Sequence, residues 1–160
     1  MKHTLTARHE GNMRFATLID GHEVSMDTNP ADGGNNSAPS PKKLMLAALT
    51  GCTGVDIVSI LNKMKVPFSH LSIQADAELT GEHTKVYSRL IIIYTIKIAL
   101  ENRPKMEKAV NLSAEKYCGV MEMFRSFAQI TTQIHYLYSI FFLLHLLQFY
   151  VLCWKSWIPQ

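Results

Sequence analysis

The feature that most constrains the fold is a long apolar segment that starts at Ser40-Pro41 and stops before Pro67. Serine caps helix N-termini and proline suits the first helical position, so this pair predicts a helix start. The residue before a proline avoids the helical conformation, and we therefore predict the helix end near Lys65. One stripe at helical spacing contains Leu44, Ala47, Ala48, Cys52, Val55 and Ser59. Other faces are also apolar, which predicts a central, widely buried helix.

One pair of strands is predicted before this helix in the sequence and a second pair after it. The first pair, 13–19 and 22–26, is joined by the turn Asp20-Gly21, and the second pair, 70–79 and 86–96, by residues 81–83. Glycine, asparagine and proline make residues 28–39 a loop, and a loop of this length is often functional. A helix over 104–112, a helix over 114–128 capped by Ser113 and a strand over 130–134 complete the order. Strands grouped in runs favour an α+β fold with antiparallel pairing.

Composition narrows the functional classes. The chain has 160 residues, enough for one domain with a real core. Its net charge of +3 is spread along the sequence, which gives little support for nucleic-acid binding. The N-terminus has no apolar run for export, and only three cysteines are present, so we expect a reducing, cytoplasmic location.

The last part of the sequence differs from the rest. We assign residues 1–136 to one mixed domain and 137–160 to a hydrophobic extension. The extension is nearly long enough to span a bilayer, although Ser139, His145 and Gln148 interrupt it. Three interpretations stay open: a membrane anchor, a helix that covers a dimer, and an accidental extension. A membrane partner is expected only if the extension is an anchor.

Two cysteines carry the chemical signal. Cys52 is flanked by Gly51 and Gly54 inside the long helix, and Cys118 opens a second apolar segment. Glycine destabilises a helix by about 1 kcal/mol relative to alanine, so close approach of another backbone or ligand access to the sulfur is expected there. The cysteines and histidines show no metal-ligand spacing, so no metal or other cofactor is predicted. A redox dithiol and two buried small hydrophobes both remain possible readings of the pair.

The sequence resembles the OsmC/Ohr family, and within it the YhfA-like branch. The resemblance rests on both cysteine motifs together and covers roughly residues 8–135 in the family's order. The stretches that carry it are Gly21-His22-Glu23, Ser40-Pro41 through Leu44, Ala47-Ala48-Leu49, Gly51-Cys52-Thr53-Gly54-Val55-Asp56 through Leu61, Lys63-Met64, and Leu112-Ser113-Ala114-Glu115-Lys116-Tyr117-Cys118.

The resemblance implies a fold, a partner and an activity. The fold is OsmC-like, with antiparallel sheets around central helices in an intertwined homodimer. The implied activity is thiol-dependent reduction of organic hydroperoxides, with a peroxide as substrate and an external dithiol as reductant. Cys52 is then the peroxidatic thiolate that becomes a sulfenic acid, and Cys118 condenses with it to a disulfide. Family members place an activating arginine in the N-terminal strands, and the candidate here is Arg14.

One departure from the family bears on activity. Peroxidase members carry a glutamate in the first turn of the cysteine helix, where it holds the arginine, whereas Lys42 and Lys43 occupy that turn here. The acid nearest to the nucleophile on its own helix is Asp56, one turn after Cys52. This departure favours the alternative of a non-catalytic OsmC-like protein that senses redox state or binds a small molecule. Cys153 has no comparable context and is expected to be a bystander.

Overall fold

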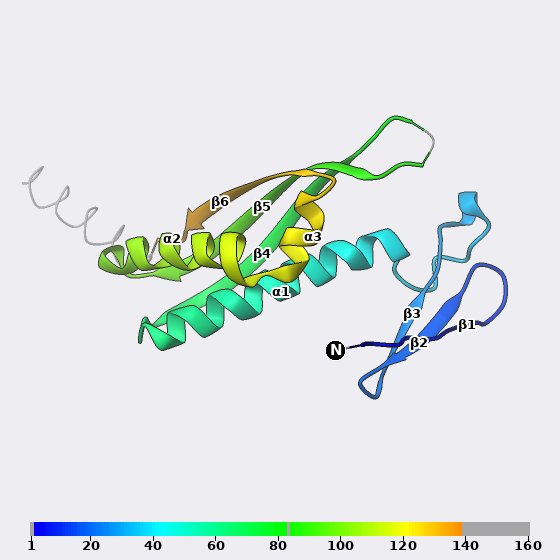
Figure 1. Ribbon diagram of the computed structural model, residues 1–160, viewed down its shortest axis with the longest axis horizontal. Helices are drawn as coiled ribbons and strands as arrows, with labels where there is room; N and C mark the ends of the chain where they lie inside the picture. The colour runs from blue at the N-terminus through cyan, green and yellow to red at the C-terminus, as the bar shows by residue number, and fades with distance from the viewer. Residues whose placement is uncertain (1, 83, 139–160) are drawn as a thin grey trace, which may run out of the picture. The chain divides into compact units, whose positions relative to one another are not determined.

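The computed structural model describes residues 2–82 and 84–138. These residues divide into two compact units, one ending at Gly51 and the other starting at Cys52, and each is described by itself. Figure 1 shows the elements in chain order. The hydrophobic extension predicted from 137 onward lies outside the described residues beyond Tyr138, so its three interpretations stay open.

The first unit contains a small antiparallel sheet in the order β1-β2-β3. Its strands are β1 (Ala7–His9), β2 (Phe15–Ile19) and β3 (His22–Met26). The predicted hairpin of β2 and β3 is confirmed, and its turn places Asp20 and Gly21 at positive φ. The strand β1 was not predicted, because its three residues are exposed and carry no alternation. The loop at 28–39 contains only a short 3-10 turn, η1 (Pro30–Asp32).

The helix α1 (Pro41–Lys63) confirms the predicted long helix, two residues short of the expected end. The wide burial that was expected is wrong for a single chain, because only a minority of the residues of α1 are buried. The Ser40 carbonyl accepts the first helical bond from the Leu44 N–H at 3.2 Å, as expected for a residue that precedes a helix. Among the described residues, α1 is long and apolar enough to cross a membrane by length and composition alone, a property that core helices share. Val55 and Val58 are 71% and 37% exposed, so part of its apolar surface is uncovered in a single chain.

The second unit is built on a sheet in the order β4-β5-β6. The strands β4 (Phe68–Leu79) and β5 (Tyr87–Ile98) pair antiparallel as predicted. The strand β6 (Gln129–Tyr136) pairs with β5 in parallel, which corrects the expectation of purely antiparallel sheets. A parallel pair requires a long crossover connection, and the segment between β5 and β6 supplies it.

That crossover contains η2 (Leu100–Asn102), α2 (Arg103–Leu112), η3 (Ser113–Tyr117) and α3 (Gly119–Arg125). Alternate residues of the middle strand β5 are buried, and the helices contribute the rest of the core. Figure 1 shows α2 and α3 beside this sheet. The fully buried side chains include Ile57, Leu61, Leu90, Ile92, Tyr94, Ile96, Met106 and Met121.

The predicted helix over 114–128 is wrong in its first part. Residues 113–117 form the π-helical turn η3, Cys118 is extended with φ −78° and ψ 94°, and only then does α3 begin. Ser113 is therefore not a cap. The cap of α3 is Cys118, whose Sγ accepts a hydrogen bond from the Met121 N–H at 3.4 Å. Single π-helical turns occur often at functional sites, and this one positions the second cysteine.

Candidate functional site

The fold of the second unit brings the two cysteines together. Cys52 lies in α1 and Cys118 precedes α3, and both are free thiols. A hydrogen bond joins their side chains. Together with one carboxylate oxygen of Asp56, their sulfur atoms form a cluster in which all three atoms lie within 4.8 Å of one another. We call these three residues the dithiol cluster.

The two thiols differ in their surroundings. Cys52 is partly accessible, whereas Cys118 is 3% exposed. Burial first, and then the hydrogen bond to Cys52, raise the pKa of Cys118 to about 11, although the hydrogen bond from the Met121 N–H acts in the opposite direction. Cys118 therefore holds its proton at neutral pH, and Cys52 is the thiol that a substrate can reach.

The glycines beside Cys52 have different roles. A Cβ at Gly54 would lie 3.0 Å from Cδ1 of Ile73 on β4, so Gly54 lets this part of α1 pack closely on the sheet. The approach is made by a side chain and not by the backbone that was expected. A Cβ at Gly51 would meet nothing within 4 Å, so packing does not require that glycine.

A buried chain of hydroxyl groups holds Asp56 in the dithiol cluster. The Ser113 hydroxyl donates to Oδ2 of Asp56 at 2.9 Å. Because the single hydroxyl hydrogen of Ser113 is donated to Asp56, the Ser113 oxygen must accept a hydrogen bond from the Thr53 hydroxyl, at 3.0 Å. The Thr53 oxygen in turn accepts from the Tyr94 hydroxyl at 2.7 Å. Thr53, Ser113 and Tyr94 are all fully buried. Sequence reasoning missed this chain, because Ser113 lies 57 positions from Asp56 and no local pattern links them.

We expect the variant Thr53→Val to destabilise the protein by about 1–3 kcal/mol, since it leaves the buried Tyr94 hydroxyl without its acceptor. Thr53→Ser keeps the hydroxyl and serves as the matched control. Tyr94→Phe removes only the terminal donor of the chain and should cost less. Chemical denaturation measures the three free energies of unfolding. Equal losses for Thr53→Val and Thr53→Ser would show that the methyl group, rather than the hydroxyl chain, is what matters.

A cavity of about 500 Å³ shares Asp56 with the dithiol cluster. Apolar side chains and two lysines line it, and Tyr117 forms part of its wall with 58% of its surface exposed. Tyr117 is therefore part of the cavity wall and not of the core. The lining residues are Asp56, Ser59, Ile60, Lys63, Met64, Lys108, Leu112 and Tyr117.

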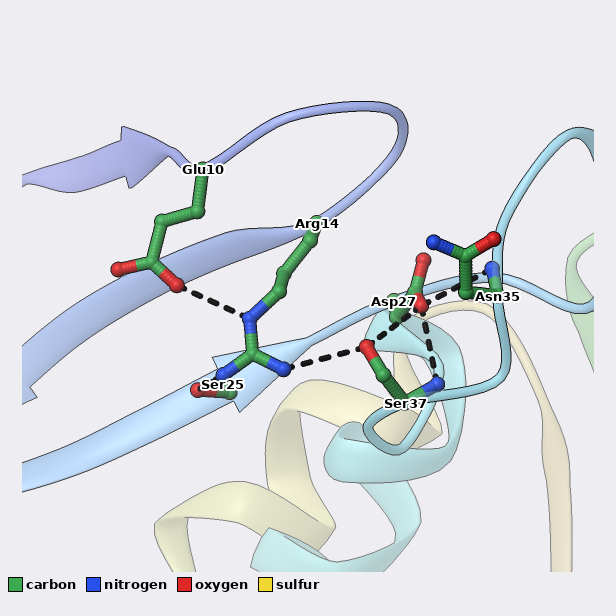
Figure 2. Close-up of polar contacts among 6 residues, drawn as sticks. All are labelled: Glu10, Arg14, Ser25, Asp27, Asn35 and Ser37. Carbon is green, nitrogen blue, oxygen red and sulfur yellow. Dashed lines mark hydrogen bonds and ion pairs between the residues drawn. The ribbon is translucent and has the colours of Figure 1, made fainter.

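The predicted activating residue, Arg14, lies in the first unit. Figure 2 shows its guanidinium between three partners. Its Nε pairs with Glu10 at 2.9 Å, and its terminal nitrogens donate to Ser37 at 3.2 Å and to Ser25 at 3.1 Å. Arg14 and Cys52 belong to different units, so the action of Arg14 on the thiol stays a prediction.

Asp27 anchors the loop beside Arg14 and was not recognised from the sequence. It is buried, and it accepts hydrogen bonds from the N–H groups of Thr28, Asn35 and Ser37 and from the Ser37 hydroxyl. Figure 2 shows the bonds from Asn35 and Ser37. These bonds, chiefly those of Ser37, lower the pKa of Asp27 from 3.8 to about 2. Ser37 thus links the buried carboxylate to the Arg14 side chain.

The lowered pKa makes the stability of the first unit depend on pH. A depressed pKa stabilises the folded state above the unfolded value of 3.8, and this contribution is lost as the pH falls through about 2. We expect Asp27→Asn to unfold at a lower temperature than wild type, with a difference that is constant above about pH 5 and shrinks in acid. Thermal melts across this pH range measure it. Glu23→Gln, a change at an exposed position of β3, is the control, and a pH-independent difference would contradict the assignment.

Comparison with known proteins agrees with this architecture. The family model described as "OsmC-like protein" matches residues 34–133, which include both described cysteines. Protein YhfA of Escherichia coli strain K12 is 32% identical over 122 residues, which cover 76% of this chain and 88% of YhfA.

Two solved structures show the same fold. A hypothetical protein from Aquifex aeolicus VF5 superposes with a TM-score of 0.74 at 22% identity, covering 87% of this chain and 99% of that one. An organic hydroperoxide resistance protein OsmC from Legionella pneumophila superposes with a TM-score of 0.60 at 19% identity, covering 83% and 97% of the two chains. The family model and the YhfA match, with a fold that unites both cysteines, show that the chain belongs to the OsmC-like protein family.

Proposed function

We propose that this protein is a thiol-dependent peroxidase that reduces organic hydroperoxides. The observation that carries the proposal is the pairing of an accessible thiol, Cys52, with a buried thiol, Cys118, joined by a hydrogen bond. A dithiol with one accessible member is what a two-cysteine peroxidase requires. The name of the Legionella structure, an organic hydroperoxide resistance protein, supports the substrate class.

In the first step the Cys52 thiolate attacks the distal oxygen of the hydroperoxide. The O–O bond breaks, the sulfur gives two electrons, and the leaving alkoxide takes the hydroperoxide proton to become the alcohol. Cys52 is left as a sulfenate, which gains a proton to form the sulfenic acid. The cavity that shares Asp56 with the dithiol cluster offers apolar walls for the organic group of the substrate.

In the second step the sulfur of Cys118 attacks the sulfenic sulfur of Cys52. The S–O bond breaks, water leaves, and a disulfide forms. Cys118 holds its proton because its pKa is raised, so this step needs a proton acceptor. We assign that role to Asp56, whose carboxylate lies in the dithiol cluster and is oriented by Ser113. Asp56 takes the thiol proton and passes it to the hydroxide that leaves Cys52, so that water departs and the carboxylate is regenerated. An external dithiol then reduces the disulfide and becomes a disulfide itself.

The proposal assigns Arg14 to activation of Cys52. A peroxidatic thiol reacts as the thiolate, which a guanidinium stabilises. The glutamate expected in the first helical turn is absent, but Glu10 already pairs with Nε of Arg14. Glu10 therefore takes over the task of orienting the arginine, and Lys42 and Lys43 do not by themselves argue against activity.

We further propose that the active form is a cytoplasmic homodimer. The apolar residues Val55 and Val58 of α1 and Leu18 of β2 are exposed in a single chain, with Leu18 59% exposed. A second copy would cover such residues in the intertwined arrangement that the family resemblance implies. Sedimentation or light scattering on the purified chain tests the dimer directly.

Stopped-flow oxidation of the reduced protein by cumene hydroperoxide tests the function. We expect Cys52 to react faster than free cysteine and peptide mass spectrometry to find a disulfide between Cys52 and Cys118. Reaction no faster than free cysteine would refute the peroxidase. It would favour the alternative, a redox-sensing or ligand-binding protein. The carboxylate beside the thiols agrees with that alternative as well, because its negative charge opposes thiolate formation.

A further inference from the structure

The dithiol cluster has the composition of a metal site as well as of a redox pair. Two sulfur atoms and one carboxylate oxygen lie within 4.8 Å of one another. The sequence predicted no metal site, because it shows no local ligand spacing. The fold supplies what spacing does not, since it places Cys118 against a helix that already carries Cys52 and Asp56.

The ligand geometry follows from secondary structure. Cys52 and Asp56 are four residues apart in α1, so both side chains project from the same face of the helix. Pairs of ligands at this spacing are a recurrent way to hold zinc on a helix. Cys118 adds the third ligand from the start of α3, where the π-helical turn ends and the chain is extended.

The surroundings already orient these ligands. The Ser113 hydroxyl occupies one position on Oδ2 of Asp56, as the outer partners of metal-bound carboxylates do. The Met121 N–H fixes Sγ of Cys118 at 3.4 Å. Cys52 and Asp56 are only partly buried, so an ion has a route to the cluster.

We propose that Cys52, Cys118 and Asp56 bind Zn²⁺ or another thiophilic divalent cation, with a fourth position left for water or a small ligand. Two thiolates and a carboxylate suit zinc, which prefers four tetrahedral ligands that include sulfur. An open fourth position makes the site exchangeable. Disulfide formation removes two of the three ligands, so oxidation releases the ion and the bound ion protects the thiols.

The site shares its thiols with the proposed peroxidase but does not depend on peroxide turnover. Metal uptake is measured without peroxide, and peroxide reactivity is measured with a chelator present. Each proposal therefore fails on its own measurement.

Cobalt is the spectroscopic probe. The full chain is reduced, treated with a chelator and carries Cys153→Ser, so that only Cys52 and Cys118 can contribute thiolate bands to the spectrum. We expect one equivalent of Co²⁺ to give thiolate-to-cobalt charge-transfer absorption with tetrahedral ligand-field bands, and Zn²⁺ to displace it. Cys52→Ser and Cys118→Ser should each abolish this spectrum. Absence of the charge-transfer band in the reduced parent protein would overturn the proposal.

Competition with a chromophoric zinc chelator gives the affinities. Loss of an outer partner costs about 10–100-fold in metal affinity, so loss of the ligand in Asp56→Asn should cost at least about 100-fold. Asp76→Asn, at an exposed position of β4, is the matched control and should bind as the parent does. Circular dichroism verifies that each variant is folded. Equal zinc affinity for Asp56→Asn and the parent would refute the carboxylate ligand and with it the site as proposed.

Oxidation tests the predicted linkage. Diamide, an azo compound, accepts the two electrons and two protons that disulfide formation releases. Treated with diamide, the zinc-loaded protein should release its ion, and added zinc should slow the loss of free thiols. Retention of zinc by fully disulfide-bonded protein would show that the ion is held elsewhere.

Discussion

Replacing Cys52 by serine is expected to abolish peroxide reduction, with a loss in kcat/KM on the order of 10³-fold or more. The hydroxyl of serine occupies nearly the same volume, so the change removes the nucleophile and little else. A serine hydroxyl cannot form a stable two-electron oxidation product as sulfur does, and no other described thiol is accessible, because Cys118 is 3% exposed. Turnover of cumene hydroperoxide with an excess of external dithiol measures the effect.

Cys153→Ser is the control for this experiment. It removes a thiol from the hydrophobic extension, and we expect activity equal to wild type because Cys153 lacks the context of the other two cysteines. If Cys52→Ser retains activity while Cys153→Ser loses it, then the nucleophile lies in the extension and the proposed site is wrong. The same variants also test whether the extension takes part in catalysis.

Local signals explain how much of the fold was predictable. The start of α1 follows from Ser40-Pro41, and the β2–β3 turn follows from Asp20-Gly21, since each signal is contained in adjacent residues. The strand β1 and the parallel pairing of β6 depend on partners distant in sequence, and so the sequence did not reveal them. The split of the helix predicted over 114–128 was missed as well, although Gly119 directly follows the extended residue and glycine disfavours a helix.

The candidate site, like the fold, was predictable only in part. Family resemblance predicted that Cys52 and Cys118 belong together, and the structure brings them together. The partners of these residues were not predictable, because Ser113, Thr53 and Tyr94 carry ordinary hydroxyl groups that gain meaning only through contacts across the fold. Asp27 is similar, since only the folded loop shows that its carboxylate is buried among donors.

Replacing Cys118 by serine should have the second large effect, and of a different kind. The first oxidation of Cys52 should proceed at the wild-type rate, but no disulfide can form, so catalytic turnover should stop after this single oxidation. The Cys52 sulfenic acid then accumulates and is oxidised further to the sulfinic acid by excess peroxide. Mass spectrometry after trapping with dimedone detects the sulfenic acid, and rapid mixing measures the single turnover.

Serine is the informative substitution at this position because Cys118 also has a structural task. Its Sγ caps α3 by accepting the Met121 N–H, and serine is among the best capping residues, so Cys118→Ser should remain folded. Cys118→Ala loses the cap as well and should cost about 0.5–2 kcal/mol of stability. If Cys118→Ser and Cys118→Ala differ in stability but lose disulfide formation equally, then the capping role and the resolving role of Cys118 are separate. Sustained turnover by Cys118→Ser at the wild-type rate would mean that the external thiol attacks the sulfenic acid directly, and Cys118 would then be a capping residue without a resolving function.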